Sequence, residues 1–280
     1  MAGGDAAAGD QAPSAYLIKA STGTPSAPVD GTAEVDGTFA MNINDGVGIV
    51  NYTAHGSWQG WVDPAFNIND ANSLTNNDKY PVMIGNACET NRFEKSVCIG
   101  EALLRGQNKG AVAYIGASNN TLWDEDFYWS VGNTSTITAN PTYASTDLGT
   151  YDRIFHTHNE PTAKWGRTVT DFIANGNLAV AQSGSSSDDY YWEIYHVLGD
   201  PSLMPYLKVP TTITVNNVPL IPIGSTSYNL TTEPFALVGL SFNGQLVSSA
   251  ISDSLGSATL NFPSLTNPGT YDLVITAQNK

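Results

Sequence analysis

Three short apolar runs constrain the fold of this chain more than any other feature. They are residues 47–53 (VGIVNYT), 80–85 (YPVMIG) and 110–116 (GAVAYIG), each bounded by turn residues. Such runs are typical of strands buried on both faces of a parallel sheet. Residues 98–108 separate the last two runs and place apolar side chains on one helical face and charged ones on the other. Strand, helix and strand predict a βαβ unit with a right-handed crossover.

Four weaker patterns complete the first part of the chain. The first 30 residues are rich in Gly, Ala, Ser and Pro and hold one apolar stretch, 15–18, which we interpret as a short strand. The others predict helices: one within 31–46, one over 161–176 and an aromatic-rich one over 190–198. For the second of these, Pro161 marks the start and Gly176 the end.

The texture of the sequence changes near residue 210. Short alternating runs follow, separated by clusters of Gly, Pro, Asn and Ser, at 212–215, 236–242, 258–262 and 271–275. This pattern is the signature of a small all-β sandwich of the immunoglobulin-like sort. We therefore expect an α/β domain over residues 1–208 and a β-sandwich over residues 209–280.

Charge and composition restrict the partners. The chain of 280 residues has 11 basic and 26 acidic residues and a net charge of −15, which argues against nucleic acid or an anionic membrane. No stretch reaches the ~18 apolar residues of a membrane span, so we expect no membrane insertion. Only 13% of residues are charged, a composition that we interpret as that of a bacterial protein that is secreted or on the cell surface. The oligomeric state stays open.

Cysteine and histidine are too few for a disulfide scaffold or a recognisable zinc site. Cys88 and Cys98 can form one bridge at most, and neither a CxxC nor an HExxH pattern occurs. Cys98 opens a predicted helix and is expected in the core. His156 and His158 are expected in a solvated loop, and His196 as a packed helix residue.

Two reactive side chains follow neighbouring predicted strands. His55 comes after 47–53 and Cys88 after 80–85, and the carboxyl ends of parallel strands are where functional groups gather. A thiol needs a base to become a thiolate at neutral pH, and a histidine can supply it and then protonate a leaving amine. Gly56 lets the backbone approach a substrate, and its N–H and that of Cys88 could form an oxyanion hole.

An ordinary structural interpretation competes with this one. A lone cysteine after an apolar strand is usually a small buried hydrophobe, and a His-Gly pair is usually a turn. The spacing of His55 and Cys88 alone favours that interpretation.

Longer motifs change the balance. The chain resembles the gingipain family of cysteine peptidases in NDGVGIVNYTAHGSWQGW, LTNNDKYPVMIGNACETNRF, CIGEALLRGQNKGAVAYIGASNNTLWDEDFYWSVG and YYWEIYHVLGDPSLMPY. The resemblance implies a caspase-like fold, a mostly parallel sheet flanked by helices. It implies a Cys88 nucleophile and a catalytic His55, with Ala54 replacing a glycine of the family's YTGHG motif. Asp10, and after it Asp5, is the best match for the third, acidic member.

The resemblance also suggests the substrate. Within the family, the segment after the third strand lines the pocket for the residue before the cleaved bond, and LWDEDFYW looks like that of the lysine-specific member. Asp126 would bind the lysine, with Trp123 flanking the pocket and Thr53 beside it. The competing interpretation of the run Asp124–Asp126 is a solvated acidic turn or a calcium site.

Catalysis of this kind needs no cofactor, and the resemblance implies structural calcium. Asp63, Asp70 or Asp152 could contribute oxygen ligands, although no EF-hand spacing marks a site.

Two functions remain open from the sequence. The first is an endopeptidase that cleaves proteins or peptides after a basic residue, which we expect to be lysine. The second is a catalytically inactive secreted adhesion or binding protein with a degenerate peptidase-like scaffold. The family's N-terminal half of the catalytic domain is almost absent before Asn44, which favours the second, whereas retention of His55 and Cys88 favours the first.

Overall fold

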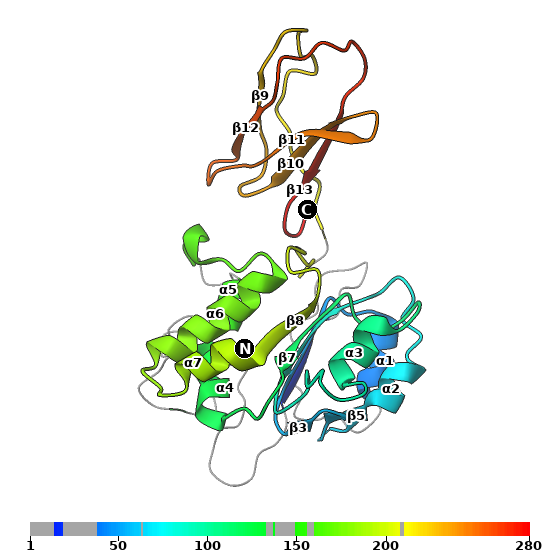
Figure 1. Cartoon of the computed structure of the whole chain (residues 1–280), viewed down its shortest axis with the longest axis vertical. Coiled ribbons are helices and arrows are strands. Elements are labelled where there is room, and N and C mark those ends of the chain that lie inside the picture. Colours follow the sequence, from blue (N-terminus) through cyan, green and yellow to red (C-terminus); the bar gives the residue numbers. More distant parts are fainter. Residues whose placement is uncertain are drawn as a thin grey trace. The chain divides into compact units, whose positions relative to one another are not determined.

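The computed structural model describes residues 14–18, 38–62, 64–132, 137, 149–155, 160–207 and 210–280. The chain divides into two compact units, Met1–Val209 and Pro210–Lys280 (Figure 1). Within the described ranges, no helix has the length and apolar character required to cross a membrane.

The first unit is built on a five-stranded sheet in the order β1-β2-β6-β7-β8 (Figure 1). Its centre is parallel and consists of β2 (Ile49–Thr53), β6 (Val82–Asn86) and β7 (Ala113–Ala117). The two edge strands, β1 (Ser14–Ile18) and β8 (Tyr195–Gly199), are antiparallel to their neighbours. The three apolar runs thus form the central strands, and the expected mixed α/β fold is confirmed.

Helices cover both faces of this sheet (Figure 1). Residues of three helices join one apolar cluster: α1 (Thr38–Asp45), α2 (Ile68–Ser73) and α3 (Ile99–Arg105). Residues of four helices join the other: α4 (Trp123–Val131), α5 (Thr150–Phe155), α6 (Val169–Gln182) and α7 (Asp188–Ile194).

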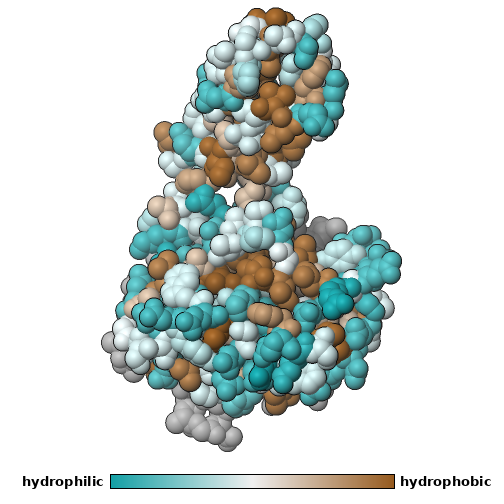
Figure 2. All heavy atoms as spheres, in the orientation of Figure 1, coloured by the Kyte–Doolittle hydropathy of each residue, from teal (hydrophilic) through white to brown (hydrophobic). Residues whose placement is uncertain are grey.

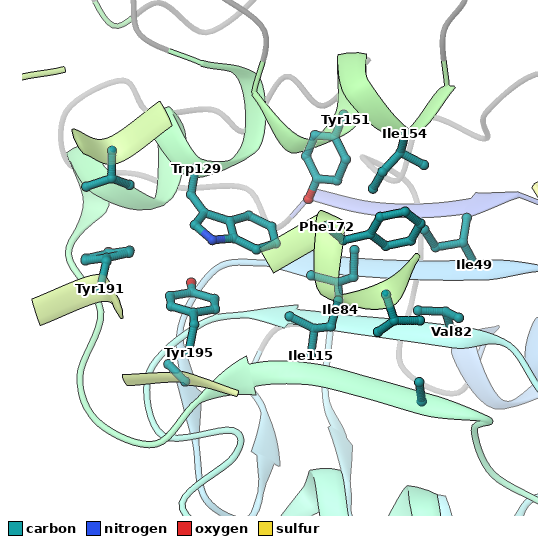
Figure 3. Close-up of a cluster of buried hydrophobic side chains, with 14 of the residues drawn as sticks. Ile49, Val82, Ile84, Ile115, Trp129, Tyr151, Ile154, Phe172, Tyr191 and Tyr195 are labelled. Atoms are coloured by element: carbon teal, nitrogen blue, oxygen red, sulfur yellow. The ribbon is translucent and has the colours of Figure 1, made fainter. Parts of the chain in front are cut away.

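Successive side chains along the central strands point alternately into the two clusters. Val50 and Met83 point to the α1–α3 side, whereas their neighbours Ile49, Ile84 and Ile115 point to the α4–α7 side, where Figure 3 shows them beneath the helices. Each such side chain contributes about 1.5–3 kcal/mol when it leaves water. Burial on both faces is why these strands have continuous apolar sequences.

A small three-stranded antiparallel sheet follows β2 and was not expected from the sequence. It consists of β3 (Gly56–Ser57), β4 (Gly60–Trp61) and β5 (Phe66–Asn67). The Trp61 ring stacks on Tyr52 of β2, with centroids 4.8 Å apart. This packing fixes the course of the chain just beyond the end of β2.

The predicted helix over 161–176 is wrong at both ends. Pro161 precedes a single 3₁₀ turn, Thr162–Lys164, and α6 begins after Thr168, whose side chain caps it. Gly176 lies inside α6. A Cβ at this position would be 2.2 Å from the Trp129 indole, so only glycine leaves room for the ring. The glycine therefore serves close packing and does not end the helix.

The predicted helix over 190–198 is also wrong in its second half. The chain leaves α7 at Ile194 and enters β8 at Tyr195, so His196 lies in a strand. A short apolar run does not distinguish a helix from a strand, and here antiparallel pairing with β7 decides. The half-buried His196 has its Nε2 atom 3.0 Å from the Ser118 hydroxyl.

The second unit contains two small antiparallel sheets, ordered β11-β10-β13 and β12-β9. Their strands are β9 (Ser227–Thr231), β10 (Leu237–Phe242), β11 (Gln245–Ile251), β12 (Ser257–Asn261) and β13 (Asp272–Thr276). The two sheets share one apolar cluster. Its classification as immunoglobulin-like stays a prediction.

Two details of this unit differ from expectation or add to it. The run 212–215 forms no strand, and the next residue, Asn216, makes an isolated bridge with Thr231. Figure 2 shows apolar side chains at the surface of the unit. The exposed ones on the three-stranded sheet are Leu237, Leu246, Ile251 and Val274.

Candidate active site

The register of the sheet brings His55 and Cys88 to the same edge. Thr53, the last residue of β2, pairs in parallel with Asn86, the last residue of β6. His55 follows the end of β2 by two residues, and Cys88 follows the end of β6 by two residues. Both side chains therefore lie just past the carboxyl ends of adjacent strands, as the sequence predicted.

Gly56 makes this approach close. A Cβ at this position would lie 2.9 Å from the Cys88 carbonyl oxygen and 2.9 Å from the Ala87 Cβ. Real Cβ atoms do not come so near, so the contact between the two loops depends on a residue without a side chain. The two predicted oxyanion donors, the N–H groups of Gly56 and Cys88, thus belong to abutting segments of backbone.

The histidine is held by its backbone and one aromatic neighbour. Its carbonyl accepts hydrogen bonds from the Tyr52 hydroxyl at 2.6 Å and from the Val62 N–H at 3.2 Å. Its exposed ring meets Trp123 edge to face, with centroids 5.1 Å apart. Trp123, predicted to flank a substrate pocket, is therefore next to His55.

The two thiols differ in access. Both are free, but Cys88 is half-buried and Cys98 is fully buried at the start of α3. Burial raises the pKa of the Cys98 thiol, which suits the core residue that the sequence predicted. Only Cys88 has the exposure that a nucleophile needs.

Thr121 contacts the Cys88 sulfur and was missed by the sequence reasoning. Its N–H donates to Sγ at 3.3 Å, and both its hydroxyl and its carbonyl oxygen lie 3.7 Å from Sγ. It belongs to the loop after β7, the third strand of the predicted sheet. Its place beyond a carboxyl strand end was the available signal, but a threonine in a polar loop has no distinctive pattern.

Asp126 is buried in the first turn of α4 and is only 4% exposed. It accepts hydrogen bonds from three hydroxyl groups, those of Thr121 at 2.6 Å, Tyr191 at 2.8 Å and Tyr195 at 3.1 Å. Burial raises the pKa of Asp126 to about 7, although the three hydroxyl donors oppose the shift. In the part of the chain that the structure describes, no lysine or arginine pairs with it.

An aromatic stack positions these hydroxyls. The Tyr195 ring stacks on Trp129, with centroids 5.1 Å apart, and on Tyr191, with centroids 5.4 Å apart (Figure 3). Behind Asp126, the Asn86 amide donates to the Asp126 carbonyl and to the Ser130 hydroxyl. The Asn86 side-chain oxygen also contacts the Tyr195 hydroxyl, which it shares with Asp126. The carboxyl thus sits in a fixed polar network anchored to β6.

Several predicted residues are not brought into the site. Asp10, Asp5 and Asp63 lie outside the described residues, as do His156 and His158. Asp70 caps α2 by accepting from the Asn67 N–H, and Asp152 lies in α5. Among the described residues, no group of three or more His, Cys, Asp or Glu side chains could hold a metal ion, so structural calcium stays a prediction.

Sequence comparisons match most of the chain to known peptidases. Residues 10–206 match the profile described as Peptidase family C25. Lys-gingipain from Porphyromonas gingivalis is 39% identical over 85% of this chain, which spans 14% of the relative's length. Gingipain R1 from the same organism is 29% identical over 85% of the chain, which spans 22% of that relative.

Solved structures agree with the fold. A structure titled "Structure of Protease" has a TM-score of 0.77 and 38% identity, covering 85% of this chain and 53% of that one. The Arg-specific cysteine proteinase gingipain R has a TM-score of 0.71 at 24% identity, covering 88% of this chain and 54% of that one. The latter likeness concerns the fold alone.

Proposed function

Because the chain belongs to peptidase family C25, we propose that it is part of a cysteine endopeptidase with Cys88 as nucleophile and His55 as general acid and base. One observation carries the proposal. The parallel pair Thr53–Asn86 supports it, because a free, partly exposed cysteine and an exposed histidine each follow their neighbouring strand end by two residues. Nucleophilic catalysis by a thiol requires such a base nearby.

The proposed reaction follows from these groups. The Cys88 thiolate attacks the peptide carbonyl carbon, and the N–H groups of Gly56 and Cys88 receive the negative charge that develops on the carbonyl oxygen. His55 protonates the leaving amine and then takes a proton from the water that hydrolyses the thioester. Asp10 is proposed as the third member, which would orient the His55 ring.

Lysine is the proposed residue before the cleaved bond. Asp126 is linked to the nucleophile through a single residue, because Thr121 hydrogen-bonds to both Asp126 and Cys88. A buried carboxyl without a cationic partner gains most from an incoming ammonium group. Trp123 beside His55 could cover the apolar stem of the lysine, and Thr53 ends the adjacent strand. The name Lys-gingipain of a relative supports the same choice.

The cellular setting is proposed from composition and from the relatives. Composition and bacterial relatives support a secreted or cell-surface bacterial protein whose partners are protein or peptide substrates. The proposed domains are the partial caspase-like peptidase domain, 1–208, and the immunoglobulin-like sandwich, 209–280.

Selective alkylation tests the proposal. The chain is treated with iodoacetamide at pH 5.5, and the modification of Cys88 and Cys98 is followed by mass spectrometry. We expect Cys88 to react at least tenfold faster than Cys98, because only an activated thiolate persists at that pH. His55→Ala should slow the alkylation of Cys88 at least tenfold and leave that of Cys98 unchanged, because burial limits Cys98. Cleavage of a lysine p-nitroanilide peptide by the chain and by a longer parent protein is measured alongside.

Two outcomes would refute the proposal. Equal, slow alkylation of both thiols would mean that no activated nucleophile exists. Full cleavage by Cys88→Ser would place the chemistry elsewhere. The first outcome, with no cleavage by either protein, would favour the inactive binding protein.

A further inference from the structure

We propose that the Thr121 hydroxyl couples Asp126 to Cys88, so that a cation bound at Asp126 activates the nucleophile. Thr121 would be a positioning residue for the proposed peptidase reaction, on which this inference rests. It would make the thiol more reactive when the correct side chain is present than when the site is empty.

The three groups form a continuous chain. The Thr121 hydroxyl donates to Asp126 Oδ2 at 2.6 Å, and the same hydroxyl oxygen lies 3.7 Å from Cys88 Sγ. Thr121 also donates its N–H to the sulfur at 3.3 Å. Among the described residues, no other hydrogen-bonds to both the sulfur and the carboxyl.

A hydroxyl has one proton to donate, and this limits what Thr121 can do at once. While Asp126 is ionised and alone, the proton is directed at the carboxylate, because hydrogen bonds to charged acceptors are the stronger ones. The oxygen then presents lone pairs to Cys88. Lone pairs favour the protonated thiol, which can donate to them, over the thiolate.

A bound ammonium group changes this balance. It supplies its own N–H donors to the Asp126 carboxylate and offsets its charge. The Thr121 hydroxyl can then rotate its proton toward the sulfur and become a second donor beside the Thr121 N–H. A second donor to the sulfur stabilises the charged form, so the thiolate is favoured over the thiol.

Other ionisable groups face the thiol and must be separated from this effect. His55 lies at the end of the adjacent strand, Glu89 follows in the chain, and Tyr190 of α7 interacts electrostatically with Cys88. None of the three hydrogen-bonds to Asp126. An ammonium at Asp126 also acts on the thiolate directly through space, with or without the Thr121 hydroxyl.

The test separates the hydroxyl from the charge. Alkylation of Cys88 by iodoacetamide is measured from pH 5 to 9 with and without n-butylammonium, which mimics the lysine stem and head but contains no peptide bond. In the unsubstituted chain, n-butylammonium should accelerate alkylation roughly threefold or more at the acidic end of this range. Thr121→Ser should retain this acceleration.

Thr121→Val is the decisive variant. It keeps the branched shape, the N–H and the Asp126 charge but lacks the hydroxyl, so it should lose most of the acceleration. If that variant does not fold, Thr121→Ala has the same expected result. Slow alkylation of Cys98 in each variant shows that the fold is intact.

The inference can fail independently of the proposed function. Equal acceleration in the valine variant would mean that charge alone acts. Slower or unchanged alkylation of the unsubstituted chain with n-butylammonium would mean that no coupling exists. Either result overturns the relay, whereas a Cys88 that is unreactive even without n-butylammonium would overturn the peptidase proposal itself.

Discussion

Burial raises the pKa of acidic side chains on both faces of the central sheet, but among the carboxyl, phenol and thiol groups so affected only Asp126 has a raised pKa near neutrality. On the α1–α3 side, burial raises the pKa of the Tyr114 phenol, whose oxygen accepts a hydrogen bond from the Trp61 indole. On the α4–α7 side, burial raises the pKa of Asp126 to about 7. The same desolvation keeps the phenol neutral at physiological pH, whereas it moves the ionisation of the carboxyl close to neutral pH. The difference marks the second face as the one suited to charge recognition.

Removing the carboxyl should have the largest effect on activity. In an active parent protein, Asp126→Asn should lower kcat/KM for lysine substrates by roughly two to three orders of magnitude, because the substrate ammonium loses its buried partner. Asp124→Asn, an exposed position on the same helical turn, is the matched control and should change the value less than twofold. Unchanged lysine cleavage by Asp126→Asn would reduce Asp126 to a structural role.

The same variant should be more stable at alkaline pH. The pKa of Asp126 in the folded state, about 7, exceeds that of an unfolded aspartate. Its contribution to stability is therefore fully present below about pH 4 and is lost as the pH rises through 7. Asp126→Asn should unfold with a free energy about 2–4 kcal/mol higher than the unsubstituted chain at pH 8.5, and with little difference at pH 4.

Urea titrations followed by tryptophan fluorescence measure this, because all six tryptophans lie in the first unit. Asp124→Asn should show no such pH dependence. If the free energy of unfolding depends on pH in the same way in the unsubstituted chain and in Asp126→Asn, the carboxyl does not titrate in this range.

Selectivity should follow the ionisation of Asp126. The ratio of kcat/KM for a lysine substrate to that for a norleucine substrate, which has a similar stem without the ammonium, should rise about tenfold between pH 6 and pH 8. Thiol and imidazole ionisation affect both substrates alike and cancel in the ratio. A flat ratio would separate Asp126 from substrate recognition.

The smallest effects come from single hydroxyl groups. Tyr195→Phe removes a donor to the Asp126 carboxylate, so the pKa of Asp126 should rise further and the selectivity curve should move to higher pH. Tyr114→Phe on the other face should cost about 1 kcal/mol of stability without moving that curve. Equal shifts in both variants would contradict the distinction between the two faces.

The sequence predicted what depends on local pattern. The three central strands were evident because burial on both faces demands continuous apolar runs, and His55 and Cys88 stood out because they follow two of them. The split between α7 and β8 was not predictable, since pairing with β7 decides it. Thr121, Tyr191, Tyr195 and Asn86 were missed because their roles arise from contacts between residues 33 to 109 positions apart.

The equal spacing beyond the Thr53–Asn86 pair has a consequence for how such proteins diverge. Residues between β2 and β6 can be gained or lost in loops without moving His55 relative to Cys88, since both positions are counted from the same rung of the sheet. One residue inserted between Thr53 and His55 would instead displace the imidazole while leaving the thiol in place. Length variation within the lineage should therefore accumulate outside these two short segments.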